Sequence, residues 1–295
     1  MRNFILGTDW YTDCDDVVAV RILSRFVKAG KANLLGVCIN TCQENSVASL
    51  KGFFRSEGLD NVAIGIDRNG PNNKKGLYQP RLANDFCPTV TNDEAENGVS
   101  LYRRLLASST EKVDIMEIGF TQVVAELLKS EPDEYSDKNG IDLVKEKVNR
   151  LWMMAGKWDV DGGMEYNFNA YPATRQGAAL ICQICPVPIT FLGYEIGADV
   201  ITGGNKALAC DDTLYKAMLD HGSGNGRSSW DPMLVLMALT GSEEESGYTT
   251  VSGYASVDPE TGANHFKNDQ NGPHRYVVKK FENEYYQDKI NALIK

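Results

Sequence analysis

Residues 4–16 read FILGTDWYTDCDD, and this stretch decides the fold class. Its apolar start predicts a strand over residues 4–9, and apolar residues recurring at helical spacing from Val17 onward predict a helix over residues 16–28. Four aspartates fall within eight residues where these elements meet. Such a cluster is costly unless the carboxylates are solvated, protonated or bound to a cation. Because open α/β sheets place ligands at the carboxyl ends of strands, these residues are the first candidate site: Asp9, Asp13, Asp15 and Asp16.

Strand-like and helix-like segments alternate after this start. The apolar pattern predicts further strands over residues 34–40, 62–66, 113–118, 151–155 and 188–192. It predicts further helices over residues 44–57, 97–108, 121–129 and 171–183. This alternation indicates an α/β fold with a mainly parallel open sheet of the Rossmann type and helices on both faces.

The pattern changes toward the end of the sequence. A helix is expected over residues 230–239, then a small C-terminal β-hairpin from residue 248 with its turn at residues 258–262, and a last helix at about 282–294. Residues 67–96 form a polar stretch rich in Gly, Pro and Asn, to which no element is assigned. No repeat or linker divides the sequence, so a single domain over residues 1–295 is expected.

Charge and hydropathy exclude two classes of partner. The formal net charge is −10, and no basic stripe stands out, which argues against nucleic acid. No segment approaches the roughly 20 apolar residues that a membrane span needs. The N-terminus leads into a strand without the apolar core of a signal peptide, so a cytoplasmic protein with no membrane partner is predicted.

The cysteines and histidines narrow the chemistry further. Seven cysteines, an odd number mostly in apolar runs, fit reduced and buried thiols, and the pair Cys182 and Cys185 lacks the partners of a zinc site. The three histidines form no HExxH motif, and the sequence contains no GxSxG elbow. Acid–base work is therefore expected to fall mainly to carboxylates.

Three segments allow a structural and a functional interpretation. Asp15 and Asp16 fit helix capping, but capping explains at most two of the four aspartates, so the charge density favours a cation. Asp231 stands before a proline, which is also typical of a helix N-cap. Glu165 and the amides after it follow a glycine-rich loop, where they could bind sugar hydroxyls or form a turn.

Together these segments resemble the nucleoside hydrolase family, whose members cleave the N-glycosidic bond of ribonucleosides with a bound calcium ion. The resemblance rests on four motifs in order: Gly7-Thr8-Asp9 with Asp15-Asp16, residues 117–125 (EIGFTQVVA), Glu165-Tyr166-Asn167, and Trp230-Asp231. It covers most of the sequence, from residue 4 to about residue 240.

The resemblance implies roles for individual residues. The side-chain calcium ligands would be Asp9, Asp16 and Asp231, and the carbonyl of Ile118 would be a main-chain ligand. The ribose hydroxyls would be contacted by Asp15, Asn40, Glu165 and Asn167. Asp9 would also be the general base, which fits chemistry in which a cation lowers the pKa of a water and a carboxylate takes its proton. Asp13 receives no role.

Three residues depart from the family pattern. Gly7 replaces the family's first aspartate, and Gln122 replaces the usual asparagine, which we interpret as a structural change. Trp230 stands where many members carry a histidine that assists the leaving base. A purine-preferring branch has Trp there, stacking on the base, and stacking of this kind is worth about 1–3 kcal/mol. The alternative for Trp230 is a rim aromatic that packs under its loop.

The predicted function is calcium-dependent hydrolysis of ribonucleosides to free base and ribose, with purines preferred over pyrimidines. The expected partners are a small-molecule ribonucleoside and, by resemblance, further copies of this chain in a homodimer or homotetramer. Two alternatives stay open. One is a non-catalytic nucleoside- or sugar-binding protein on the same scaffold. The other is a phosphatase of the haloacid-dehalogenase type that would use Asp13 and Asp15.

Overall fold

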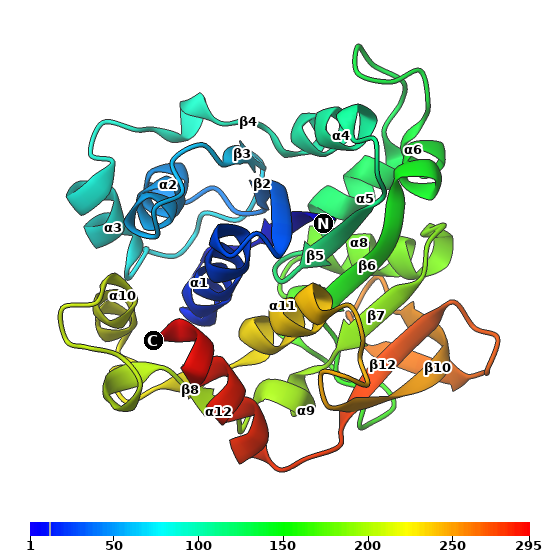
Figure 1. Ribbon diagram of the computed structural model, residues 1–295. Coiled ribbons are helices and arrows are strands. Elements are labelled where there is room, and N and C mark those ends of the chain that lie inside the picture. Colours follow the sequence, from blue (N-terminus) through cyan, green and yellow to red (C-terminus); the bar gives the residue numbers. More distant parts are fainter. Residues whose placement is uncertain (12) are drawn as a thin grey trace.

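The computed structural model describes residues 1–11 and 13–295. Strands and helices alternate along most of the chain (Figure 1). The strands are β1 (Arg2–Thr8), β2 (Ala32–Ile39), β3 (Ala63–Ile66), β4 (Glu96–Asn97), β5 (Val113–Glu117), β6 (Val148–Met154), β7 (Ile189–Leu192), β8 (Ile201–Thr202), β9 (Arg227–Ser228), β10 (Tyr248–Val257), β11 (Asn264–Asn268) and β12 (His274–Lys279). The helices are α1 (Asp15–Lys28), α2 (Ser46–Ser56), α3 (Gln79–Phe86), α4 (Gly98–Ser108), α5 (Gln122–Lys129), α6 (Gly140–Lys147), α7 (Tyr166–Asn169), α8 (Pro172–Ile184), α9 (Tyr194–Gly197), α10 (Thr213–His221), α11 (Trp230–Thr240) and α12 (Asn283–Ile294).

One large sheet organises the described residues. Its strand order is β11-β10-β12-β7-β6-β5-β1-β2-β3-β4. Neighbouring strands from β12 through to β4 run parallel, whereas β10 is antiparallel to both β12 and β11. The predicted fold class, a mainly parallel α/β sheet, is confirmed.

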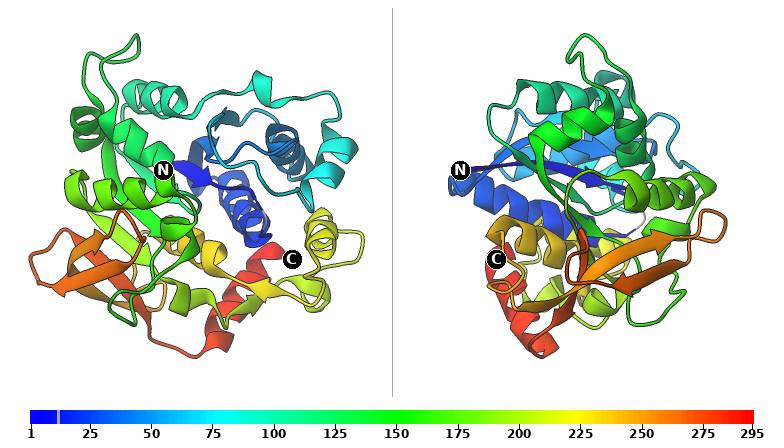
Figure 2. Two further views of the ribbon diagram at one scale, coloured as in Figure 1. Left: turned by 180° about the vertical axis from the view of Figure 1, so that it is seen from behind. Right: turned by 90° about the vertical axis from the view of Figure 1, so that its right-hand side faces the viewer.

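Side chains alternate between two cores along the central strands. In β1, Phe4 and Leu6 belong to the core formed with α1, α2 and α11, whereas Ile5 belongs to the core formed with α4, α5 and α8. This period of two is what a strand covered on both faces requires. Figures 1 and 2 show α1, α11 and α12 grouped together, apart from α4, α5 and α8. Helices therefore cover both faces, as the sequence predicts.

The strand β12 is the main element that the sequence pattern does not reveal. It pairs with β7 in parallel, with Tyr276 opposite Phe191, and with β10 in the antiparallel direction. The predicted C-terminal hairpin of β10 and β11 is present, and β12 joins it to the large sheet (Figure 1). Only His274 and Val277 of this short strand are buried, so its apolar pattern is weak.

Short helices were also missed where the chain is polar. Residues 67–96, to which the sequence pattern assigns no element, contain α3. The pattern also does not predict α10, which precedes the loop that leads to α11. For α10 the signals were present: the Asp212 side chain accepts a hydrogen bond from the Leu214 N–H, and Gly222 ends the helix with a φ of 90°. None of the helices in the described part of the chain has the length and apolar character that a membrane crossing requires.

The chain reverses its direction of travel across the sheet beside β1. From β1 it proceeds outward through β2, β3 and β4, and it then returns to β5 on the other side of β1. In a parallel sheet such a switch point leaves a crevice at the carboxyl ends of the two strands. Asp9 follows β1 and Ile118 follows β5, so both predicted site residues lie at this crevice.

Candidate active site

A pocket of about 340 Å³ lies over this crevice. It collects side chains from the loop after β1, the start of α1, the loop before α3, α7, α9 and the start of α11. Most of the predicted site residues line it: Asp9, Asp15, Asp16, Glu165, Asn167, Trp230 and Asp231. Asn40 and Ile118 lie behind its wall, fully or almost fully buried. The structure therefore brings together residues more than 200 positions apart.

Three carboxylates form the centre of this pocket. Oxygen atoms of Asp15, Asp16 and Asp231 all lie within 4.8 Å of one another, and all three residues are buried. The backbone N–H of Asp231 donates to Oδ2 of Asp15 over 3.1 Å, which couples the starts of α1 and α11. The N-cap of α11 is Ser229, so the local interpretation of Asp231 as a cap is wrong, and its carboxylate is free to face the pocket.

Asp9 joins the same electrostatic group from the loop after β1. Burial, together with the charges of Asp13 and Asp15, raises the pKa of Asp9 well above its usual range. Trp10, directly after it, adopts a left-handed φ of 45°, and its backbone N–H donates to Oδ1 of Asp16 over 3.3 Å. Strained backbone of this kind is concentrated at functional sites. The turn links Asp9 to Asp16 through Trp10, but Asp9 is not one of the three carboxylates whose oxygen atoms lie within 4.8 Å of one another.

The charge balance of the four carboxylates fits a cation. Burial first, and neighbouring aspartates second, raise the pKa values of Asp15, Asp16 and Asp231 as well. Within the described residues, no lysine or arginine forms an ion pair with Asp9, Asp15, Asp16 or Asp231. Buried carboxylates without a cationic partner are expensive, and an all-oxygen donor set suits a hard divalent cation.

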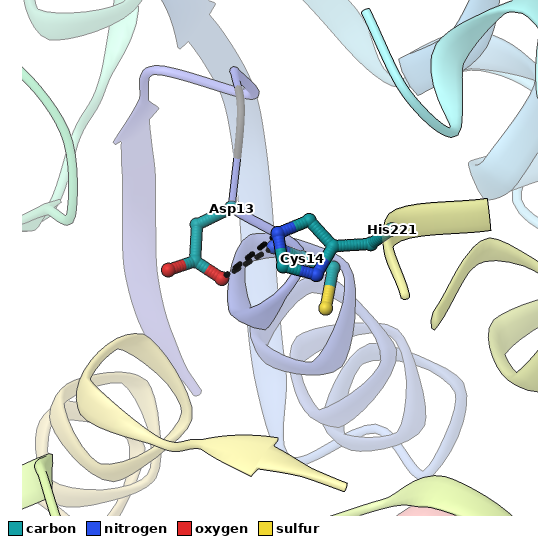
Figure 3. A group of neighbouring side chains, drawn as sticks. All are labelled: Asp13, Cys14 and His221. Atoms are coloured by element: carbon teal, nitrogen blue, oxygen red, sulfur yellow. Dashed lines mark hydrogen bonds and ion pairs between the residues drawn. The ribbon is translucent and has the colours of Figure 1, made fainter. Parts of the chain in front are cut away.

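Asp13 stands apart from this group, because Arg227 binds it. The Arg227 Nε donates to Oδ1 of Asp13 over 2.9 Å, and a terminal nitrogen of the guanidinium lies 2.5 Å from Oδ2. Figure 3 shows Asp13 with Cys14 and His221, whose Nε2 lies 3.9 Å from Oδ1 of Asp13. Burial raises the pKa of the Cys14 thiol, which keeps it protonated. Asp13 thus anchors the loop before α11 to the start of α1.

Gly7 has a structural consequence that the sequence did not reveal. It lies opposite Glu117 in the register of β1 and β5, and a Cβ atom on Gly7 would lie 2.1 Å from Oε2 of Glu117. Oε1 of Glu117 accepts hydrogen bonds from the Asn40 side chain over 2.8 Å and from the Gly119 N–H over 3.1 Å. Burial raises the pKa of Glu117 to about 8. A carboxylate from the neighbouring strand therefore fills the space over Gly7.

Asn40 and Gln122 form hydrogen bonds in the wall behind the pocket. The Asn40 amide donates to Glu117, and its oxygen accepts from the Phe120 N–H over 3.0 Å. Gln122 donates to the carbonyl of Asn40 over 2.7 Å, in keeping with the structural role expected for it. The carbonyl of Ile118, the predicted main-chain ligand, accepts from the Asn167 amide over 3.3 Å. Contact between Asn40 and a ribose stays a prediction.

Glu165 and Asn167 form another wall of the pocket. Glu165 is the N-cap of α7, and its carboxylate accepts from the backbone N–H groups of Asn167 over 2.7 Å and Gly156 over 3.0 Å. Glu165 thus both caps the turn and lines the pocket. Burial raises the pKa of Glu165 to about 7 despite these hydrogen bonds.

Glu165→Gln is expected to remove part of the pH dependence of folding stability in calcium-free buffer. The folded-state pKa of Glu165 lies above its ordinary value of 4.5, so the wild type loses stability as pH rises from about 4.5 to about 7. The variant does not undergo this loss. Relative to the wild type it should gain up to about 3 kcal/mol between pH 4.5 and pH 8, as measured by urea unfolding. A stability difference that is constant across this range would contradict the prediction.

Trp230 combines the two interpretations considered for it. Its indole N–H donates to the carbonyl of Tyr194 over 2.6 Å, and the two rings stack with centroids 5.3 Å apart. The Arg227 guanidinium lies 5.5 Å from the centroid of the Trp230 ring. Trp230 therefore packs at the rim and also lines the pocket, as Tyr194 does.

No family model matches this chain, and no curated protein sequence matches it, whereas solved structures do. An inosine-uridine preferring nucleoside hydrolase from Bacillus anthracis superposes with a TM-score of 0.70 at 13% identity, over 100% of this chain and 99% of that protein. A purine-preferring ribonucleoside hydrolase from Gardnerella vaginalis gives 0.73 at 14% identity, over 99% and 98%. This chain has the nucleoside hydrolase fold.

The nucleoside hydrolase fold also occurs in an effector protein. The type III effector protein XopQ, solved in complex with adenosine diphosphate ribose, superposes with a TM-score of 0.70 at 17% identity, over 100% of this chain and 93% of that protein. At identities this low, the similarity establishes the nucleoside hydrolase fold and leaves the chemistry to the site residues.

Proposed function

We propose that this protein hydrolyses the N-glycosidic bond of ribonucleosides and releases the free base and ribose. The observation that carries the proposal is the buried group of Asp15, Asp16 and Asp231 beside Asp9, placed at the switch point of the nucleoside hydrolase fold. Because the pocket draws on residues from position 9 to position 231, the proposal treats residues 1–295 as one functional domain.

Calcium is the proposed cation. Asp9, Asp16, Asp231 and the carbonyl of Ile118 would hold it, and their oxygen donors fit this hard ion. When bound, calcium would lower the pKa of a water beside it. Asp9 would accept the proton of that water as the water attacks C1′ of the sugar. Burial and the neighbouring carboxylates favour protonated Asp9, so a bound cation would also keep Asp9 ionised and able to accept this proton.

The sugar is proposed to lie between the carboxylates and α7. Asp15, Glu165 and Asn167 line the pocket around this space and offer acceptors and an amide to ribose hydroxyls. Cleavage would develop positive charge on the sugar ring, as in other glycoside hydrolyses, and the surrounding carboxylates would stabilise it. The rings of Trp230 and Tyr194 provide flat surfaces on which a base could stack. The proposed preference for purines rests on the resemblance to the branch that has Trp at this place.

Ribose release from a nucleoside panel tests the proposal. Inosine, adenosine, uridine and cytidine would each be incubated with the protein and calcium, and free ribose would be measured by a reducing-sugar assay. We expect release from the purine nucleosides at a higher kcat/KM than from the pyrimidine nucleosides. Failure to release ribose from any of the four, with calcium present and the circular dichroism spectrum of a folded protein, would contradict the proposed function.

A non-catalytic binding protein is the second candidate. It is favoured by one observation: a neighbour with this fold was solved with bound adenosine diphosphate ribose. Recovery of the intact nucleoside from the pocket after long incubation would support binding without turnover. The phosphatase alternative is less well supported, because β1 ends at Thr8 and Asp13 is bound to Arg227. Cytoplasmic location and a homo-oligomer stay predictions from the sequence.

A further inference from the structure

The pocket contains a lysine to which the resemblance assigns no role. Lys74 belongs to the polar stretch between β3 and α3, and its side chain lines the pocket with Asp9, Glu165 and Asp231. A cation at this place in a pocket of carboxylates calls for an explanation. The proposed metal chemistry does not use it.

An aromatic cluster holds Lys74 in position. The cluster consists of Tyr11, Phe120, Tyr166 and Tyr171, with the Phe120 ring 5.4–6.1 Å from the other three. The Lys74 ammonium donates to the Tyr166 hydroxyl over 3.0 Å and lies 5.1 Å from the centroid of that ring. It also lies 5.6 Å from the centroid of the Tyr11 ring. Such cation–π contacts favour a charged ammonium at a defined place.

The residue before Lys74 fixes the loop to the same cluster. Oδ1 of Asn73 accepts hydrogen bonds from the Tyr11 hydroxyl over 2.7 Å and from the Tyr171 hydroxyl over 3.0 Å. Because two tyrosine hydroxyls donate to the same amide oxygen of Asn73, they fix the position of the loop. Lys74 is thereby directed to the pocket by its neighbour as well as by its own contacts.

Lys74 lies at the exposed edge of the pocket. Glu165 and Asn167, the proposed sugar contacts, are buried in the pocket wall, whereas Tyr166 between them is 43% exposed at the mouth. Since Lys74 is bonded to the Tyr166 hydroxyl, its ammonium is at the mouth too. A base attached to a sugar bound at this wall would extend toward this mouth.

Among the described residues that line the pocket, Lys74 is the basic side chain that no carboxylate pairs with. Arg227, the other basic residue that lines it, is committed to Asp13. Among the residues that the structure describes, no histidine lines the pocket. The hydrogen bond to Tyr166 raises the pKa of Lys74, with a smaller contribution from the charge of Asp9, so the ammonium is protonated at neutral pH.

We propose that Lys74 is the leaving-group acid of the reaction. The inference rests on the proposed function. As water adds to C1′ and the C1′–N bond breaks, the electron pair of that bond stays on the base nitrogen. The Lys74 ammonium gives one proton to the base, and Asp9 takes one proton from the water. Lys74 then ends neutral and Asp9 protonated, and exchange with solvent restores both.

Two substrates with different leaving groups test this assignment. Hypoxanthine, the base of inosine, needs a proton to depart, whereas the nitrophenolate of 4-nitrophenyl β-D-ribofuranoside departs without one. Lys74→Met should lower kcat/KM for inosine about 100-fold and change kcat/KM for the nitrophenyl riboside by less than about 3-fold. Lys74→Arg keeps the charge but holds its proton more tightly, so it should stay about 10-fold slower than the wild type on inosine.

Neighbouring residues supply the controls. Lys75→Met removes the same charge from the same loop at an exposed residue that does not line the pocket, and both substrates should be cleaved at wild-type rates. Asn73→Ala releases the loop and should give a smaller loss that is again confined to inosine. Activity on the nitrophenyl riboside also shows that each variant is folded.

The outcomes separate this inference from the proposed function. A loss for Lys74→Met that is equal on both substrates, or a loss on inosine below about 3-fold, would overturn the assignment of Lys74 while ribose release by the wild type stands. If the wild type releases ribose from neither substrate with calcium present, the proposed function fails, and the assignment of Lys74 fails with it.

Discussion

Asp231→Asn is expected to weaken calcium binding more than about 100-fold and to reduce ribose release to background at low calcium. Changes to residues that only support metal ligands cost roughly 10–100-fold in metal affinity, so the loss of a direct ligand should exceed that range. The asparagine keeps the size of the side chain and removes its charge. High calcium should therefore restore part of the activity.

Asp9→Asn should behave differently, because Asp9 is proposed to take the proton of the attacking water as well as to bind calcium. Its activity should fall by about 10²–10⁴-fold and should not recover at high calcium. Calcium affinity would be measured by isothermal titration calorimetry and activity by ribose release. Asp137→Asn, which removes one exposed carboxylate, serves as the control for net charge. Wild-type calcium affinity in Asp231→Asn would exclude Asp231 as a ligand.

Gly119→Ala should damage both the fold and the candidate site. A Cβ atom on Gly119 would lie 2.2 Å from the backbone nitrogen of Asp9 and 2.8 Å from Oδ1 of Asn40. A backbone atom cannot rotate away, so the loop that carries Asp9 must move. Overpacking of this kind costs about 3 kcal/mol, and a displacement of about 1 Å at a reacting group costs roughly 100-fold in rate. We expect both losses, in urea unfolding and in kcat.

Gly7→Ala is the matched comparison, since its new Cβ would meet a side chain instead of backbone. Oε2 of Glu117 would lie 2.1 Å from it. Glu117 can move only by giving up its hydrogen bonds from Asn40 and Gly119, so Gly7→Ala should also destabilise the fold. Adding Glu117→Ala should relieve much of this cost, whereas it should not rescue Gly119→Ala. Equal rescue of both glycine variants would contradict this account of the crevice.

The parallel part of the fold was predictable because its strands are buried on both faces. Strand β1 lies between β2 and β5 with a core on each side, and such burial leaves an apolar run that is visible in sequence. Strand β12 is short and half exposed, and it belongs to the sheet only through its contacts with β7 and β10. Its pairing depends on elements far away in the sequence, which no local pattern reports.

The candidate site also has a part that the sequence predicts and a part that it does not. The density of charge in residues 9–16 pointed to a cation without any structure, and the resemblance added Asp231. Three features of the site were not predictable from the sequence: the ion pair of Asp13 with Arg227, the position of the Glu117 carboxylate over Gly7, and the position of Lys74 in the pocket. Each is a contact between segments that only the folded sheet brings together. The spacing of residues within one segment carries no information about such contacts.

The candidate cation site uses carboxylates from two helices, Asp15 and Asp16 on α1 and Asp231 on α11. This arrangement has a consequence for how the protein matures. The cation proposed for this site would bind the finished fold and not the unfolded chain, so by mass action it would add to the free energy of unfolding as its concentration rises. During synthesis the amino-terminal half emerges with its aspartates unbalanced, and the partner carboxylate follows more than 200 residues later. Binding of the proposed ion would therefore follow the completion of folding, and the metal-free protein should be the form that proteases recognise first.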